Sequence, residues 1–165
     1  MRGAGTLRFL PEKTDQWGGD RAHRAIDHFP GHGASVSAVP GQARLRALVV
    51  DDDDDIRVLM RRALERAGFE VFDFADAESL IASHEQLSAD IVVSDIGLPG
   101  IDGIDVCASV LRRWPDLPVI LVTAFRDEDL LRRAQAAGAR RILTKPLNIA
   151  DLASQAKELA LHVQR

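Results

Sequence analysis

The chain of 165 residues lacks several features that would place it in particular protein classes. It has no tyrosine and one cysteine, Cys107, so an internal disulfide is excluded. A single cysteine also gives no zinc-ligand spacing, and its helical surroundings predict a small buried hydrophobic residue. The first residues contain no apolar stretch long enough for a signal peptide, and no run approaches membrane-spanning length. The sequence therefore predicts a cytoplasmic protein with no membrane association.

Basic residues are also in deficit. Lysine and arginine number 21 against 25 aspartates and glutamates, which gives a formal net charge of −4. Non-specific binding to nucleic acid relies on clustered basic residues, so direct DNA binding is not expected. A hydrophobic content of 46% with 28% charged residues is typical of a globular protein.

Composition changes near residue 43. Residues 1–43 are rich in glycine and proline and show little apolar periodicity. Their histidines, His23, His28 and His32, are too loosely spaced to favour a metal site. We expect residues 1–43 to form a flexible, disordered N-terminal extension and residues 44–165 to form the folded domain.

From Leu45 onward, short β-branched runs alternate with amphipathic stretches. Strands are predicted at 45–50, 70–74, 90–94, 119–123 and 141–144. The first helix should bury one face and end at Gly68. That face is formed by Ile56, Leu59, Met60, Ala63 and Leu64. Further helices are predicted at about 77–86, 103–113, 128–137 and 149–162. Five strand–helix units predict an α/β fold, a parallel sheet with helices on both faces.

Polar residues stand where these strands end. Asp51 and Asp52 follow the first strand, Asp95 the third and Lys145 the fifth, while Thr123 ends the fourth. The carboxyl ends of parallel strands share one edge, where ligands bind in open sheets. Clustered carboxylates repel one another unless a cation compensates them, and oxygen ligands suit Mg²⁺. With a hydroxyl and an ammonium group nearby, this edge could bind a phosphoryl group, with Asp95 as nucleophile.

The other three members of the aspartate run, Asp53 to Asp55, have a structural interpretation. They are expected to cap and occupy the first turn of the following helix, where carboxylates meet the positive end of the helix dipole. Asp102 is likewise expected to cap a helix.

The segment from Leu45 to about His162 resembles the receiver domain of two-component response regulators. The matching stretches are Leu48-Val49-Val50-Asp51-Asp52, Ser94-Asp95-Ile96-Gly97-Leu98-Pro99-Gly100-Ile101-Asp102-Gly103, Val122-Thr123-Ala124 and Leu143-Thr144-Lys145-Pro146. The resemblance implies a flavodoxin-like three-layer sandwich with five parallel strands in the order 2-1-3-4-5. Since one helix follows Lys145 and no output domain is recognised, it also suggests the stand-alone type of receiver.

The resemblance implies a role for each matching residue. Asp95 matches the phospho-accepting aspartate and a Mg²⁺ ligand. Asp52 matches the acid that binds Mg²⁺ directly, and Asp51 the acid that acts mainly through water. Gly97 would offer its backbone carbonyl to the metal.

The phosphoryl-binding and switch residues are also implied by the resemblance. Thr123 matches the switch hydroxyl, Ala124 the small residue beside it, and Lys145 the lysine that pairs with Asp95 or the phosphoryl oxygens. The resemblance also implies a cis Lys145-Pro146 bond, since the Lys-Pro bond is often cis in the family. Receivers commonly carry an aromatic residue where this chain has Ile142, so the switch is expected to run through Thr123 and the following loop.

The resemblance thus implies a receiver in a phosphorelay rather than an enzyme acting on other substrates. Its partners would be a histidine kinase or phosphotransfer protein and a downstream protein that binds the face of residues 128–137, 141–144 and 149–162. That face could also pair two receivers. Two alternatives stay open: a degenerate receiver that only docks or dimerises, and a Mg²⁺-dependent phosphatase of the haloacid-dehalogenase kind.

Overall fold

A computed structural model of the chain describes residues 44–163. The predicted N-terminal extension over 1–43 lies outside the described residues. Strands and helices alternate along the described part: β1 (Arg46–Val50), α2 (Asp54–Arg66), β2 (Glu70–Phe74), α3 (Ala77–Leu87), β3 (Ile91–Asp95), α4 (Gly103–Arg113), β4 (Val119–Thr123), α5 (Glu128–Ala136), β5 (Arg141–Thr144) and α6 (Ile149–Val163). Every predicted element is present, with ends that differ by a residue or so.

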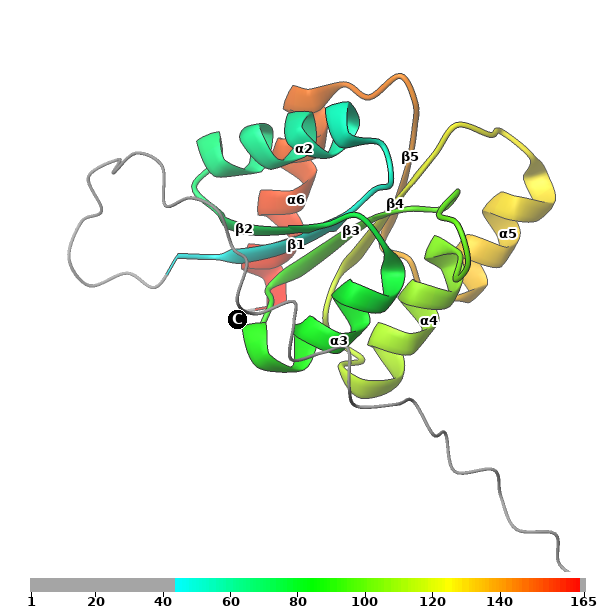
Figure 1. Cartoon of the computed structure of the whole chain (residues 1–165), viewed down its shortest axis with the longest axis horizontal. Coiled ribbons are helices and arrows are strands. Elements are labelled where there is room, and N and C mark those ends of the chain that lie inside the picture. Colours follow the sequence, from blue (N-terminus) through cyan, green and yellow to red (C-terminus); the bar gives the residue numbers. More distant parts are fainter. Residues whose placement is uncertain (1–43, 164–165) are drawn as a thin grey trace, which may run out of the picture. The chain divides into compact units, whose positions relative to one another are not determined.

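The five strands form one parallel sheet in the order β2-β1-β3-β4-β5, as predicted. Each strand continues into a helix that returns along the sheet, so all the carboxyl ends reach the same edge. In Figure 1, α2 and α6 cover one face of the sheet, and α3, α4 and α5 cover the other. The three-layer sandwich of the prediction is therefore confirmed.

A separate hydrophobic core lies on each face. Leu48, Val50, Val92 and Leu121 pack with α3, α4 and α5 on one side. The residues of opposite parity in the same strands pack with α2 and α6 on the other side: Ala47, Val49, Ile91, Val93, Ile120 and Val122. Because both faces of the strands are buried, β1, β3 and β4 read as continuous apolar runs rather than alternating ones.

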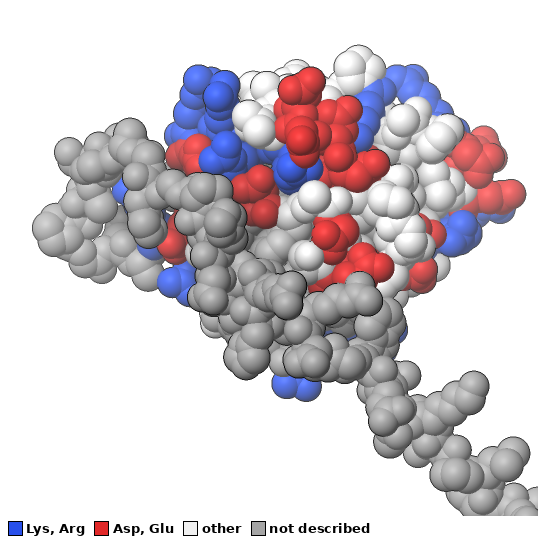
Figure 2. All heavy atoms as spheres, in the orientation of Figure 1, with Lys and Arg blue, Asp and Glu red and all other residues white. Residues whose placement is uncertain are grey.

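Aspartates begin four of the helices. The carboxylates of Asp53, Asp76, Asp102 and Asp127 accept hydrogen bonds from backbone amides in the first turns of α2, α3, α4 and α5. Asp54 and Asp55 occupy the first turn of α2 and Arg66 its last turn, charges that favour the helix dipole. Figure 2 shows red acidic side chains at the start of α2 and blue basic side chains toward its end. The capping interpretations of Asp53 and Asp102 are confirmed.

Two details of the prediction were wrong. The sequence pattern puts Leu59 on the apolar face of α2, but Leu59 is 44% exposed, whereas Met60, Ala63 and Leu64 are buried. Leu59 lies at the edge of the stripe, where the helix surface turns toward solvent. β3 runs over 91–95 rather than 90–94 because Asp95 is itself a strand residue, paired with Val122. Within residues 44–163, none of the helices has the length and apolar character needed to cross a bilayer.

Candidate functional site

The ammonium group of Lys145 joins two carboxylates at the carboxyl edge of the sheet. Its Nζ lies 2.7 Å from Oδ1 of Asp95 and 3.0 Å from Oδ2 of Asp51. Lys145 follows β5, Asp95 ends β3 and Asp51 follows β1, so residues that are distant in the sequence meet because the parallel strands end at one edge.

 Asp51 and Lys145, for example, are separated by 94 positions in the sequence. The structure therefore brings together three of the predicted site residues.

Asp51 is the most deeply enclosed of these acids. It is fully buried, and burial raises the pKa of its carboxyl, while the amide of Asp53 and the ammonium of Lys145 act in the opposite direction. Oδ1 accepts a hydrogen bond of 2.9 Å from the Asp53 amide, and Oδ2 accepts the bond from Lys145. Both carboxylate oxygens are thus held in place by the protein.

Asp95 is 5% exposed, so its carboxylate lies just beneath the surface of the rim. Oδ2 accepts a hydrogen bond of 2.6 Å from the Gly97 amide, and Oδ1 faces the lysine. For Lys145, burial lowers the pKa, but the bonds and charges of Asp95 and Asp51 outweigh burial and leave the pKa raised. The lysine is therefore firmly protonated between two acids.

Thr123 ends β4 and is 1% exposed. Its Oγ1 accepts a hydrogen bond of 3.0 Å from the Phe125 amide, and its carbonyl accepts one of 2.8 Å from the Lys145 amide. Ala124 is exposed, and Phe125 is 64% exposed. The loop after β4 thus carries a buried hydroxyl followed by an open apolar surface, and the Lys145-Pro146 peptide bond beside it is cis.

Asp52 and Gly97 are exposed on the rim, while Ile142 is half-buried and packs against the core beneath α3, α4 and α5. In the described part of the chain, no three His, Cys, Asp or Glu side chains are grouped closely enough to hold a metal. The oxygen donors still fit Mg²⁺, because this ion commonly binds one or two carboxylates and keeps several waters. Asp51 and Asp95 would supply the two carboxylates, and the exposed Asp52 directly follows Asp51 in the chain.

Two features of the site were not assigned a role from the sequence. A Cβ on Gly103 would lie 2.0 Å from the carbonyl oxygen of Asp95, so only glycine lets α4 start this close to β3. Arg57 of α2 donates a 2.7 Å hydrogen bond from Nη1 to the carbonyl oxygen of Asp51. The sequence carries no signal for this bond, because its acceptor is a backbone atom.

Comparison with known proteins agrees with this arrangement. The family model of the response regulator receiver domain matches residues 47–157. The C4-dicarboxylate transport transcriptional regulatory protein DctD of Rhizobium meliloti is 39% identical over 122 residues, which are 74% of this chain and 25% of DctD. The DNA-binding transcriptional regulator NtrC of Salmonella typhimurium is 35% identical over 116 residues, 70% of this chain and 25% of NtrC. The chain thus spans about a quarter of the length of these relatives.

Solved structures give the same result. A CheY-like receiver domain protein of Methanospirillum hungatei superposes with a TM-score of 0.70 at 29% identity, covering 74% of this chain and 98% of that one. The chemotaxis protein CheY4 of Vibrio cholerae gives a TM-score of 0.67 at 26% identity, covering 71% of this chain and 99% of the other. From the matched family model, the sheet order and these relatives, the chain belongs to the response regulator receiver domain family of two-component systems.

Proposed function

We propose that this chain is a phospho-accepting receiver, in which Asp95 takes a phosphoryl group from a histidine kinase or a phosphotransfer protein. The observation that carries the proposal is the bridge from Lys145 to both Asp95 and Asp51 at the sheet edge. A cation fixed beside a nearly buried carboxylate offers a place for phosphoryl oxygens once the carboxylate has reacted. The folded domain over 44–165 would be the unit that performs this reaction.

The reaction is a displacement at phosphorus. An oxygen of the Asp95 carboxylate forms a bond to phosphorus while the bond from phosphorus to the donor, a histidine nitrogen or an acetate oxygen, breaks. Lys145 can then pair with an oxygen of the transferred group instead of with Asp95. The hydroxyl of Thr123 would donate to another of these oxygens, beside the small side chain of Ala124.

Mg²⁺ would be held by Asp51, Asp52, Asp95 and the backbone carbonyl of Gly97. When bound, it would neutralise the charge of the acids and of the incoming phosphoryl group. The protein residues provide the rest: the Asp53 amide orients Asp51, and the Gly97 amide orients Asp95.

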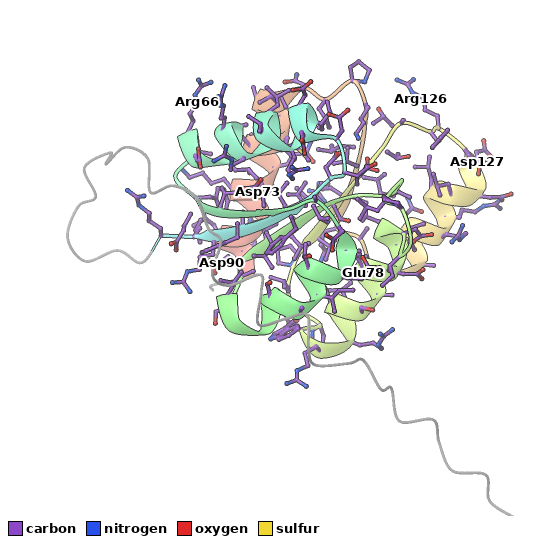
Figure 3. The ribbon with its side chains drawn as sticks, in the orientation of Figure 1. Arg66, Asp73, Glu78, Asp90, Arg126 and Asp127 are labelled. Atoms are coloured by element: carbon purple, nitrogen blue, oxygen red, sulfur yellow. The ribbon has the colours of Figure 1, made fainter. Side chains whose placement is uncertain are left out.

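We further propose that phosphorylation changes the affinity of the face formed by α5, β5 and α6 for a partner protein or a second copy of the chain. Charges of both signs are exposed at its start: Arg126 and Asp127 project outward from the loop before α5 (Figure 3). Arg133 of α5 lies 3.5 Å from Asp102, the residue that caps α4. Mixed charges of this kind favour selective recognition over tight non-specific binding.

Intact mass measurement tests the proposal directly. The protein is incubated with acetyl phosphate and Mg²⁺ beside the variant Asp95→Asn, which keeps the shape of the side chain. A gain of one phosphoryl group that hydroxylamine removes, and that the variant lacks, is the expected result.

Two other outcomes would replace the proposal. A chain that acquires no adduct at any Mg²⁺ concentration, yet binds a partner, would be a docking or dimerisation module, a role that Ile142 in place of an aromatic residue would suit. Rapid hydrolysis of small phosphate esters would instead indicate a phosphatase of the haloacid-dehalogenase kind.

A further inference from the structure

We propose that Arg57 is a positioning residue of the phosphorylation site, which acts by fixing the peptide bond between the two acids that follow β1. The inference rests on the proposed function, because it concerns the same acids. Arg57 touches neither Asp95 nor Lys145 in any described contact, and its effect is exerted through the backbone of Asp51.

Each of the three guanidinium nitrogens of Arg57 contacts a different oxygen-bearing residue. Nη1 donates to the carbonyl oxygen of Asp51 at 2.7 Å, Nη2 pairs with the carboxylate of Asp54, and Nε lies 3.3 Å from Oδ2 of Asp73. The Arg57 side chain is only 14% exposed, so its bond to the Asp51 carbonyl is partly shielded from water, whereas the side chain of Asp54 is 83% exposed. A planar fork of five donors can hold three acceptors at once, which a lysine ammonium on a flexible stem does less well.

The acid that holds the Arg57 side chain from the sheet side lies on the edge strand β2. Asp73 is paired in register with Val49 and faces α2, between the strand and the helix in Figure 3. It also lies 3.6 Å from Nε of Arg61, one turn further along α2. Arg57 and Arg61 therefore both contact Asp73, but of the two only Arg57 also bonds to a residue of the site.

The carbonyl that Arg57 holds belongs to the peptide that joins Asp51 to Asp52. The carboxylate of Asp51 is already fixed by Lys145 and the Asp53 amide, whereas Asp52 is exposed. Fixing the plane of this peptide limits where the Asp52 side chain can lie. Arg57 would thus preorganise the second acid for a cation, so that less conformational freedom is lost when the cation binds.

The positive charge of Arg57 and its positioning effect change Mg²⁺ affinity in opposite directions. The direction of the measured change therefore distinguishes the two effects. Removing a positive guanidinium beside an acidic loop should by itself strengthen the binding of a divalent cation. If positioning dominates, Arg57→Gln must instead weaken Mg²⁺ binding. The matched control is Arg61→Gln, which removes the same charge from the same helix and also removes a contact with Asp73.

The experiment compares the wild-type chain with Arg57→Gln, Arg57→Lys and Arg61→Gln. Mg²⁺ affinity is measured by calorimetric titration with MgCl₂, and backbone order of the Asp52 amide is measured by ¹⁵N relaxation without metal. We expect about a tenfold loss of Mg²⁺ affinity in Arg57→Gln, a smaller loss in Arg57→Lys, and a change of less than about twofold in Arg61→Gln, since an oriented charged hydrogen bond is typically worth such a factor. The order parameter of Asp52 should fall only in the Arg57 variants.

Equal or tighter Mg²⁺ binding by Arg57→Gln, with the Asp52 amide as ordered as in the wild type, would overturn the inference. If Arg57→Gln does not fold, Arg57→Lys carries the comparison with Arg61→Gln. A wild-type chain that binds no Mg²⁺ and gains no phosphoryl group would overturn the proposed function and the inference together. A wild-type chain that does both, with no difference between the Arg57 and Arg61 variants, would overturn the inference alone.

Discussion

Replacing Lys145 with methionine should destabilise the metal-free protein strongly, because it leaves two acids without their shared cation. Asp51 is fully buried and the side chain of Asp95 is 7% exposed, and both lie within 3.0 Å of the Lys145 ammonium. Removing one partner of a buried ion pair typically costs about 3–5 kcal/mol. Since the lysine side chain is 23% exposed and the rim admits water, we expect the lower end, about 3 kcal/mol.

The assay is thermal unfolding followed by circular dichroism in EDTA at pH 7. For a folded domain of this size, a loss of about 3 kcal/mol lowers Tm by roughly 10 °C. Lys157→Met is the matched control, because Lys157 is an exposed lysine whose ammonium donates a hydrogen bond to the carbonyl of Ala67. It should lower Tm by no more than about 2 °C.

The stability difference between Lys145→Met and the wild type should decrease as the pH falls. Burial already raises the pKa of Asp51, and the loss of Lys145 removes an influence that lowers this pKa. An acid whose pKa is higher in the folded state binds more protons there, so its contribution to stability increases as pH falls through that pKa. Melts at pH 5 should therefore show a smaller gap between Lys145→Met and wild type than melts at pH 7.

Two further changes sharpen the test. Millimolar MgCl₂ should restore part of the lost stability, since a bound cation replaces the missing charge. Asp95→Asn, which leaves Lys145 paired with Asp51 alone, should change stability by less than about 1 kcal/mol or increase it. A Tm for Lys145→Met equal to that of Lys157→Met, or a gap that does not narrow at pH 5, would refute the reasoning.

Three other predictions concern the rim and the core. Gly103→Ala should lower the free energy of unfolding, measured in urea, by at least about 3 kcal/mol, because its Cβ would clash with backbone atoms. Gly68→Ala, with φ +100° and open space around the residue, should lower it by only about 1–2 kcal/mol. Equal losses in the two variants would contradict the clash. Burial raises the pKa of the Cys107 thiol to about 11, so this thiol ionises at lower pH in the unfolded chain than in the folded one. The free energy of unfolding should therefore fall by roughly 2–3 kcal/mol between pH 8.5 and 11. Cys107→Ala should lack this pH dependence. Thr123→Val removes the acceptor of the Phe125 amide, and hydrogen exchange of that amide should accelerate, whereas Thr123→Ser should retain its protection.

Much of the fold could be predicted because short local sequence patterns indicate the strands and the positions where they end. Val49-Val50 followed by Asp51, and Val92-Val93-Ser94 followed by Asp95, mark both a buried strand and the edge where it ends. The parallel arrangement then places those acids together. Leu59 was misplaced because a periodic pattern identifies a stripe but not its width.

The supporting contacts of the site could not be read in the same way. The bond from Arg57 to the carbonyl of Asp51 involves a backbone atom, which carries no sequence signal. Its link to Asp73 depends on how α2 crosses β2, a tertiary arrangement. The need for glycine at 103 also depends on a distance between α4 and β3 that only the folded chain defines.

The two hydrophobic cores described above meet only through the strands between them. Leu64 belongs to the layer of α2 and α6, and Leu80 to the layer of α3, α4 and α5. Substitutions in different layers share no side-chain neighbours, so their free energies should add, whereas substitutions within one layer should show thermodynamic coupling. One helical layer can therefore diverge in sequence, and acquire new binding preferences, while the other layer keeps its packing.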